Sequence, residues 1–329
     1  MSYILLTWLL APIWWPISLF RKLLNSQPKR ILILEIAGIG DVVCSTHLFK
    51  QLRAQYAGAL IDLVVDPIAE TLAPVLTMID RVIAFPYARQ KGLLGRLRLA
   101  LLCSHYDTAI SLIPSAAQLT GFCWAAMPRR LSILPSALNS SYRYLRPCLT
   151  ASAVHKTGTY FLGTQANLLV KLGVSMLDAS KWLPAETIKP QSAKATIQIG
   201  LLVSSGRALK RIEPDKLLEI VNGLLALQPG LEVVLIGGPG DKALAQSLVA
   251  AISGAQRARV IDTVGHYKLY ELPAQLQKLA LLVGVDSGIT HMADALGVSI
   301  VCVAGPVDLK EVYQPGCNRC QLAAALPCY

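Results

Sequence analysis

Charged side chains are scarce in this sequence: they make up 16% of its 329 residues, against 53% for hydrophobic residues. The scarcity excludes intrinsic disorder, because disordered chains combine high net charge with low hydrophobicity. The length suits two domains of about 150 residues each. The composition therefore predicts a folded protein with heavily buried strands, contact with a membrane, or both.

Acidic residues are especially rare in one part of the chain. Between Arg81 and Lys156 there are ten basic residues and one acid, Asp107. Residues 1–160 carry 16 basic and 7 acidic side chains, a net charge of +9, whereas residues 161–329 carry 15 and 13, a net charge of +2. The first half is therefore expected to meet an anionic partner. No recognisable nucleic-acid-binding module accompanies the charge, which favours a membrane surface or a phosphorylated acceptor over nucleic acid.

The N-terminus lacks the features of a secretory signal peptide, since no basic residue precedes its apolar stretch and no small-residue cleavage site follows it. The stretch is uncharged from Ile4 to Phe20 and is followed by Arg21 and Lys22. Its length is at the lower limit for a bilayer span, and two prolines interrupt it. We therefore expect residues 1–28 to be an interfacial or re-entrant membrane-associating segment. A full span and a helix packed on the protein's own core are the alternatives.

The sequence also lacks a disulfide framework. Five of its eight cysteines are scattered and are expected to pack as small apolar side chains. The other three, Cys317, Cys320 and Cys328, form one cluster, but a structural zinc site needs four ligands. We therefore expect no bound metal.

From residue 31 onward, short continuous apolar runs alternate with segments of helical period. The predicted strands are residues 31–36, 60–65, 81–85 and 107–112, then 196–203, 231–236, 259–261, 281–285 and 299–303. Such alternation indicates parallel sheets covered by helices on both faces, an α/β fold. We expect an N-terminal Rossmann-like domain over residues 29–173, a linker over 174–195, and a C-terminal Rossmann-like domain over 196–329. The two domains are expected to face each other across a cleft.

A glycine-containing loop follows the first strand of the first half. The run Gly38-Ile39-Gly40-Asp41 has no third glycine, because residue 43 is Val, and this argues against a nicotinamide-dependent oxidoreductase. Asp41 falls where the loop enters a helix. It is either a helix cap or a functional carboxylate.

Two loops of the second half carry polar residues after buried strands. Ser204-Ser205-Gly206, followed by Lys210 and Arg211, is either an anion site or a solvated basic loop. Asp286-Ser287-Gly288, followed by His291, is a second turn from strand to helix. His291 is either functional or an ordinary histidine on the first helical turn.

In spacing and order, these loops together resemble glycosyltransferase family 9, the lipopolysaccharide heptosyltransferases with a GT-B fold. The matching residues are Ile31–Asp41 with Thr46, Ser204 with Lys210 and Arg211, Leu235–Pro239, Asp286-Ser287-Gly288 with His291, and Gly305-Pro306.

The resemblance implies an inverting, metal-independent enzyme that needs no cofactor besides its nucleotide-sugar donor. The donor in this family is usually ADP-heptose, and the acceptor is lipopolysaccharide core or another lipid-linked envelope glycan. By resemblance, Asp41 is the general base and Lys210 meets the developing charge of the diphosphate. The alternative is a catalytically degenerate family member that binds nucleotide or glycan as a scaffold at the membrane.

The other site residues are predicted from the resemblance together with the basic excess of the first half. Those expected to bind the donor are Ser204, Ser205, Lys210, Arg211, Gly237, Asp286, Ser287, Gly288 and His291. Those expected to bind the acceptor lie in the basic first half: Gly40, Thr46, Arg129, Arg130, Arg143 and Lys156. Because basic residues directly follow the apolar segment, the expected location is the cytoplasmic face of the inner membrane, as a peripheral or monotopic protein.

Overall fold

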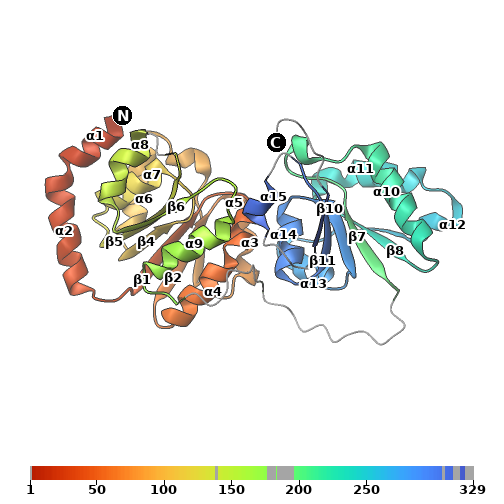
Figure 1. The fold of residues 1–329 in the computed structure, drawn as a ribbon, viewed down its shortest axis with the longest axis horizontal. Coiled ribbons are helices and arrows are strands. Elements are labelled where there is room, and N and C mark those ends of the chain that lie inside the picture. Colours follow the sequence, from red (N-terminus) through yellow and green to blue (C-terminus); the bar gives the residue numbers. More distant parts are fainter. Residues whose placement is uncertain are drawn as a thin grey trace. The chain divides into compact units, whose positions relative to one another are not determined.

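The structure, a computed structural model, describes residues 2–137, 140–175, 183, 196–305, 308–313 and 319–322. The chain divides into two compact units. The first comprises Met1–Ser180 with Lys310–Tyr313, and the second comprises Lys181–Leu309 with Gln314–Tyr329. Each unit contains a six-stranded parallel sheet with helices packed on it (Figure 1). The expectation of two parallel-sheet α/β domains is confirmed.

The first sheet has the strand order β3-β2-β1-β4-β5-β6. Its strands are β1 (Arg30–Glu35), β2 (Leu60–Val65), β3 (Arg81–Ala84), β4 (Thr108–Ser111), β5 (Arg129–Pro135) and β6 (Ala151–His155). The strand order reverses between β1 and β4. In open parallel sheets, ligands bind beyond the carboxyl ends of the strands at such a switch point.

The helices of the first unit cover both faces of this sheet. They are α3 (Ile39–Cys44), α4 (Thr46–Gln55), α5 (Pro67–Glu70), α6 (Gly92–Cys103), α7 (Ala116–Trp124), α8 (Ser140–Leu145) and α9 (Phe161–Val170). Helices α6 and α7 pack on the β1 side chains of even number, including Leu32, Leu34 and Ile36. These side chains form one hydrophobic core of the unit.

The second sheet has the strand order β12-β11-β10-β7-β8-β9. Its strands are β7 (Gln198–Leu202), β8 (Glu232–Ile236), β9 (Val260–Asp262), β10 (Leu281–Val285), β11 (Ser299–Val303) and β12 (Arg319–Leu322). The helices along this part of the chain are α10 (Pro214–Leu227), α11 (Lys242–Ala251), α12 (Gly254–Arg257), α13 (Leu272–Leu276), α14 (Gly288–Ala295) and α15 (Leu309–Val312). Its switch point lies between β7 and β10.

The apolar N-terminal segment forms two helices, α1 (Ser2–Leu9) and α2 (Ala11–Leu24), which are bent by 61° relative to each other. They contact α7 of the first unit (Figure 1). Within the described part of the chain, no single helix is long and apolar enough to cross a membrane, although this bent pair passes by length and composition. Trp14 and Ser18 are buried against the unit. The sequence analysis gave a helix packed on the protein's own core as one alternative for this segment. One side of the two helices does pack in this way.

Polar groups hold α2 in place. The Ser18 hydroxyl donates a hydrogen bond to the carbonyl oxygen of Met127 at 2.9 Å. The Arg21 guanidinium donates to the carbonyl oxygens of Tyr106 and Ala125, each at 2.8 Å. Of the two basic residues that directly follow the apolar stretch, Arg21 is thus an anchor to the protein, whereas Lys22 is exposed.

The outward side of the two helices is apolar. Its exposed side chains, which we call the N-terminal apolar patch, are Leu5, Trp8, Leu9, Ile13, Trp15, Ile17, Leu19, Phe20, Leu23 and Leu24. Leu23, for example, is 83% exposed. A surface helix of a water-soluble protein normally turns its apolar stripe inward and its polar side outward. Helix α2 does the reverse, because hydrogen-bonding groups face the protein and leucine, isoleucine and phenylalanine face outward.

Candidate functional site

Two loops of the second unit meet at its switch point. Ser204 and Ser205 follow β7, and Asp286 follows β10; all three are buried. Lys210 reaches Asp286, and their side chains form an ion pair through Asp286 Oδ2. The other carboxylate oxygen, Oδ1, lies 3.1 Å from Nε2 of His291. Residues far apart in the sequence therefore lie at one place in the second unit. We call this set the Lys210 cluster: Ser204, Ser205, Lys210, Asp286 and His291.

The charges in this cluster support one another. Burial alone would raise the pKa of Asp286, but the neighbouring His291 and Lys210 hold it well below its usual range. The carboxylate therefore stays ionised and fixes both the ammonium group and the imidazole. Gly305 leaves room for this arrangement, since a Cβ there would lie 3.2 Å from Cγ of Lys210.

The turn after β10 opens helix α14. Ser287 is its N-cap and accepts a hydrogen bond from the backbone N–H of Thr290 at 3.3 Å. Gly288 is the first helical residue, and His291 follows within the first turns. The positive end of this helix therefore lies in the same turn as Asp286. Combined with Lys210, it gives the cluster the character of an anion site.

The other two predicted donor residues lie beside the loop after β7. Arg211 donates from Nε to the carbonyl oxygen of Ser205 at 2.9 Å. Gly237 follows β8, and a Cβ there would come within 2.9 Å of Cγ2 of Val203. The second unit thus brings the predicted donor residues to one edge of its sheet.

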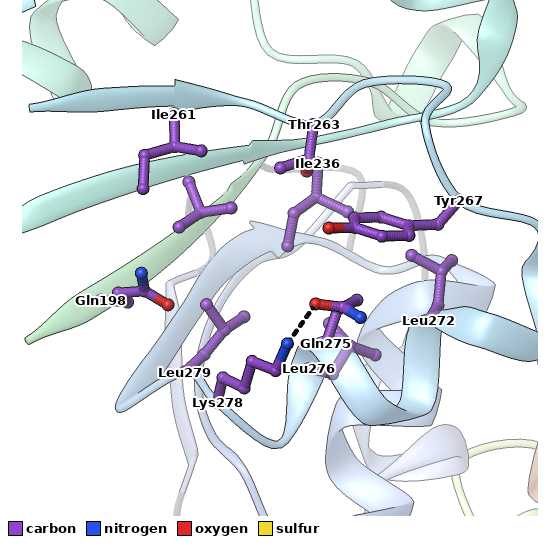
Figure 2. A pocket seen from close by; sticks show the side chains of 11 residues that line it. Gln198, Ile236, Ile261, Thr263, Tyr267, Leu272, Gln275, Leu276, Lys278 and Leu279 are labelled. Atoms are coloured by element: carbon purple, nitrogen blue, oxygen red, sulfur yellow. Dashed lines mark hydrogen bonds between the residues drawn. The ribbon is translucent and has the colours of Figure 1, made fainter. Parts of the chain in front are cut away.

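A cavity of about 210 Å³ lies on one face of the second sheet. Figure 2 shows its walls: Ile236, Ile261 and Thr263 face helix α13, and Tyr267 lies at one side. Lys278 is the one charged residue that lines it, and its Nζ donates to Oε1 of Gln275 at 2.8 Å. The cavity is mainly apolar, and no residue of the Lys210 cluster is among the described residues that line it.

In the first unit, Asp41 caps its own helix. Its Oδ2 accepts the backbone N–H of Gly38, the N-cap of α3, at 2.9 Å. The second unit repeats this arrangement, because Oδ2 of Asp241 accepts the N–H of Gly238 at 2.9 Å. Asp41 is nevertheless exposed, so its carboxylate stays open to a ligand. Capping and a chemical role are compatible at this position.

Glu35, the last residue of β1, is a buried carboxyl group next to this loop. It accepts a hydrogen bond from the Ser45 hydroxyl at 3.1 Å, and Ser45 accepts one from Gln165 at 2.8 Å. Burial raises the pKa of Glu35 well above its usual value, and the nearby charge of Asp41 raises it further. Glu35 is therefore harder to ionise than an exposed glutamate.

The raised pKa of Glu35 predicts a pH effect on stability. A carboxyl group with a raised pKa contributes fully below its unfolded pKa of about 4.3, and its contribution is lost as the pH rises through the folded pKa. Glu35→Gln keeps an oxygen for Ser45 but does not ionise. We expect the variant to lose less free energy of unfolding between acidic and neutral pH than the wild type. Urea unfolding across this range measures the difference, and parallel pH profiles would contradict it.

Arg129 and Arg130 were expected to bind the acceptor, and the structure shows this expectation to be wrong. Both residues begin β5, so they lie at the amino end of a parallel strand, whereas the loop of Asp41 lies at the carboxyl end of β1. Arg129 donates to the carbonyl oxygen of Asn25 at 2.6 Å, and Arg130 donates to Oγ of Ser18 at 2.5 Å. Both side chains are buried anchors for the N-terminal helices.

Thr46, another predicted acceptor residue, begins α4, and its binding role stays a prediction. Its side chain is buried, and its hydroxyl donates to the carbonyl oxygen of Val43 at 2.7 Å. Gly40 lies in the first turn of α3. Arg143 on α8 and Lys156 directly after β6 are exposed, and their binding role stays a prediction.

The cysteine cluster falls mostly outside the described residues, which include Cys320 but neither Cys317 nor Cys328. Cys320 is exposed on β12. In the ranges that the structure covers, no group of three or more His, Cys, Asp or Glu side chains is placed to hold a metal ion.

Sequence reasoning missed a second cavity, of about 480 Å³, at the switch point of the first sheet. Its lining includes Gln90, Arg96, Ser115 and Gln118. The sequence contains one indication of part of this lining. Ser115-x-x-Gln118 follows the predicted strand 107–112, and a Ser-x-x-Gln pattern at such a place is typical of the start of a helix. Ser115 is indeed the N-cap of α7 and accepts the N–H of Gln118 at 3.4 Å.

Two parallel α/β sheets, each with polar loops at its switch point, are the architecture of GT-B glycosyltransferases. Solved structures agree: a glycosyl transferase of family 9 from Veillonella parvula has a TM-score of 0.69 at 22% identity, covering 90% of this chain and 87% of that one. An Escherichia coli heptosyltransferase with ADP-2-deoxy-2-fluoro heptose has a TM-score of 0.69 at 17% identity, covering 91% and 93%. These likenesses define the fold.

The model of glycosyltransferase family 9 (heptosyltransferase) matches residues 188–322. Lipopolysaccharide heptosyltransferase 2 of Salmonella typhimurium is 24% identical over 297 residues, which cover 84% of this chain and 83% of the relative. The enzyme of the same name from Escherichia coli is 23% identical over the same coverage. The resemblance to family 9 is confirmed, and the chain is a family 9-like glycosyltransferase.

Proposed function

We propose that this glycosyltransferase transfers heptose from ADP-heptose, with inversion and without a metal, to lipopolysaccharide core or another lipid-linked envelope glycan. The Lys210 cluster is the observation that carries the proposal, because it supplies fixed cationic and hydroxyl groups for a diphosphate. The relatives support the sugar and the acceptor, since they are named as lipopolysaccharide heptosyltransferases and one was solved with an ADP-heptose analogue.

On the donor side, the leaving group is the nucleoside diphosphate. As the bond from the anomeric carbon to the diphosphate breaks, negative charge grows on the departing oxygen. Lys210, the hydroxyls of Ser204 and Ser205, and the amides at the start of α14 are placed to meet this charge. Donors fixed before the reaction stabilise such charge without a reorganisation cost. Asp286 and His291 position Lys210 and the donor.

On the acceptor side, Asp41 is the proposed general base. The acceptor hydroxyl oxygen attacks the anomeric carbon on the face opposite the diphosphate, and its proton passes to the Asp41 carboxylate. One carbon–oxygen bond forms while another breaks, so the configuration inverts. The exposure of Asp41 suits this role.

Nucleotide titration tests the donor side. The full chain in detergent is titrated calorimetrically with ADP, UDP, GDP and NAD without added metal. We expect ADP to bind best, and Lys210→Met to abolish the preference. Stronger binding of UDP or GDP would assign a different sugar donor, and binding of none of the four would favour the catalytically inactive scaffold.

We also propose that the protein docks on the cytoplasmic face of the inner membrane as a peripheral or monotopic protein. The N-terminal apolar patch supports this, because its outward leucine, isoleucine and phenylalanine side chains would each gain about 1.5–3 kcal/mol on leaving water. The charges agree as well: residues 1–28 contain no acid, and neither do residues 86–106, which include α6. Anionic lipid attracts such a surface.

Substitution within the patch tests the docking. Ile17→Glu places a charge where an exposed apolar side chain faces outward, so we expect vesicle binding to fall by at least about tenfold. Leu227→Glu is the matched control, since Leu227 is an exposed leucine at the end of α10 in the second unit. Sedimentation with anionic vesicles measures both variants. Equal loss in the two, or no loss in Ile17→Glu, would count against the patch.

A further inference from the structure

The segment that carries Asp41 links β1 to α4. It begins after Glu35, the last residue of β1, and ends at Ser45, which lies between α3 and α4. Helix α3 itself has only six residues. A helix of this length is not stable alone in water, because its few hydrogen bonds do not offset the cost of forming the first turn. The position of Asp41 therefore depends on what holds the two ends of the segment.

Glu35 and Ser45 join these two ends. Both residues are buried, and the Ser45 hydroxyl donates a hydrogen bond to Oε2 of Glu35 at 3.1 Å. The backbone N–H of Ser45 donates to the carbonyl oxygen of Asp41 at 3.0 Å. Ser45 therefore contacts Glu35 through its side chain and Asp41 through its main chain. Two hydrogen bonds through one residue connect the buried carboxyl group to the residue that bears the proposed base.

Gln165 connects the same serine to helix α9. Its Nε2 donates to Oγ of Ser45 at 2.8 Å, and its side chain is buried. Helix α9 packs on β5 and β6 and contacts α4 (Figure 1). The Ser45 hydroxyl is thus both a donor and an acceptor, which fixes its direction. The Asp41 segment is held by β1 on one side and by α9 on the other.

Packing alone does not explain a glutamate at this position. The four preceding residues, Ile31–Leu34, are apolar and fully buried. Burial of a carboxyl group costs free energy that burial of an apolar side chain does not, and the raised pKa of Glu35 reflects this cost. The charge of Asp41 contributes to the same rise in pKa, so the two carboxyl groups lie near each other. The contacts of Glu35 therefore indicate a role in the Asp41 segment rather than in the hydrophobic core.

Resting on the proposed function, we propose that Glu35 is a positioning residue for the sugar transfer and holds Asp41 in place through Ser45. Glu35 is buried and bonded to Ser45, so it acts through this contact and does not itself touch the acceptor. Asp41 must lie within hydrogen-bond reach of the acceptor hydroxyl to take its proton. A displacement of about 1 Å at a reacting group can slow a reaction by about 10²-fold. Loss of the bond between Glu35 and Ser45 is therefore expected to slow transfer without removing any group that reacts.

Single-turnover transfer with the full chain in excess tests this role, because its rate constant does not depend on the fraction of enzyme that is folded. ADP-heptose and lipopolysaccharide core are the substrates. We expect Glu35→Leu, which removes the acceptor for the Ser45 hydroxyl, to lower the rate constant by about 10–10²-fold. Glu35→Gln keeps an oxygen for this hydroxyl, so we expect it to restore transfer to near the wild-type rate.

Asp62→Leu is the matched control. Asp62 is a buried carboxyl group on the neighbouring strand β2, where it accepts hydrogen bonds from Tyr106 at 2.5 Å and Arg81 at 2.8 Å, both outside the Asp41 segment. We expect this variant to lose free energy of unfolding but to keep the single-turnover rate constant of the wild type. Equal rate constants in Glu35→Leu, Asp62→Leu and the wild type would overturn the proposal. A Glu35→Gln variant as slow as Glu35→Leu would overturn it as well.

Amide hydrogen exchange separates failure of this inference from failure of the proposed function, because it needs no substrate. We expect Glu35→Leu and Ser45→Ala each to speed exchange in residues 37–45 by about fivefold or more, the effect of one lost hydrogen bond, whereas Asp62→Leu leaves this segment unchanged. Unchanged exchange in Glu35→Leu would overturn the positioning role even where transfer occurs. If exchange becomes faster but Asp41→Asn keeps full transfer, Glu35 still positions the segment, and the assignment of Asp41 as the base fails.

Discussion

Asp41→Asn is expected to lower sugar transfer by about 10²–10⁴-fold, the usual contribution of a positioned general base. The amide cannot take the acceptor proton at neutral pH. It retains an oxygen for the N–H of Gly38, so the cap of α3 and the fold are expected to persist. Nucleotide binding, which depends on the second unit, should change less than about twofold, a difference of roughly 0.4 kcal/mol. Single-turnover transfer and nucleotide titration on the same preparation measure the two effects.

Asp241→Asn separates capping from chemistry. Asp241 makes the same 2.9 Å bond to Gly238 in the same Gly-x-Gly-Asp pattern, so the two variants disturb equivalent caps. We expect them to lose similar free energy of unfolding, up to about 1 kcal/mol. If Asp41→Asn kept full transfer activity, Asp41 would be a cap alone. If its activity loss were matched by an equal loss of stability, misfolding would be the cause.

The sheets followed from the sequence where strands are continuously apolar. Leu60–Val65 and Leu281–Val285 coincide with β2 and β10, which are buried on both faces from their second residue onward. Ser299–Val303 coincides with β11, where every second residue is only partly buried. Strands β5, β6 and β12 were missed. The first opens with two arginines, and the second, Ala151–His155, is a half-exposed edge with little hydrophobicity.

The error about Arg129 and Arg130 has the same origin. Without β5, a pair of arginines in a basic region looks like a surface for an anionic ligand. In the structure, the pair lies at the amino end of β5. Arg129 donates a hydrogen bond to the carbonyl oxygen of Asn25, and Arg130 donates one to that of Cys148. Amino-acid composition does not distinguish an arginine that binds a ligand from an arginine that stabilises the fold. Both add the same positive charge to a region of the sequence.

The Lys210 cluster and the cavity of the first unit were predictable to different degrees. The Lys210 cluster was expected because its members lie in loops after strands that the sequence defines, and such loops meet at a switch point. The cavity with Gln90 and Arg96 was not expected. Its residues come from α1, α6 and α7, and neutral amide side chains carry no charge pattern that distinguishes a ligand group from a packed one.

Lys210→Met is expected to weaken nucleoside diphosphate binding by about 10²-fold or more, since a charge-assisted bond to phosphate is lost. It should also destabilise the second unit by about 3–5 kcal/mol, because Asp286 is 6% exposed and would keep only His291 as an ion-pair partner among the described residues. Methionine preserves most of the side-chain length, so packing against Gly305 is retained. Calorimetric titration with ADP and urea unfolding measure the two losses.

The pH dependence of this variant gives an independent check. The lowered pKa of Asp286 means that its ion pairs stabilise the folded state above the unfolded pKa of about 3.9, and this contribution is lost as the pH falls. In Lys210→Met the pKa of Asp286 rises, so the loss on acidification should become smaller and should begin at higher pH. Lys216→Met is the matched control, because Lys216 pairs with Glu219 at 2.8 Å on an exposed helix face, where such pairs contribute at most about 1 kcal/mol. Equal behaviour of the two variants would mean that Lys210 is a solvated basic residue, and the anion site would then have to be sought elsewhere.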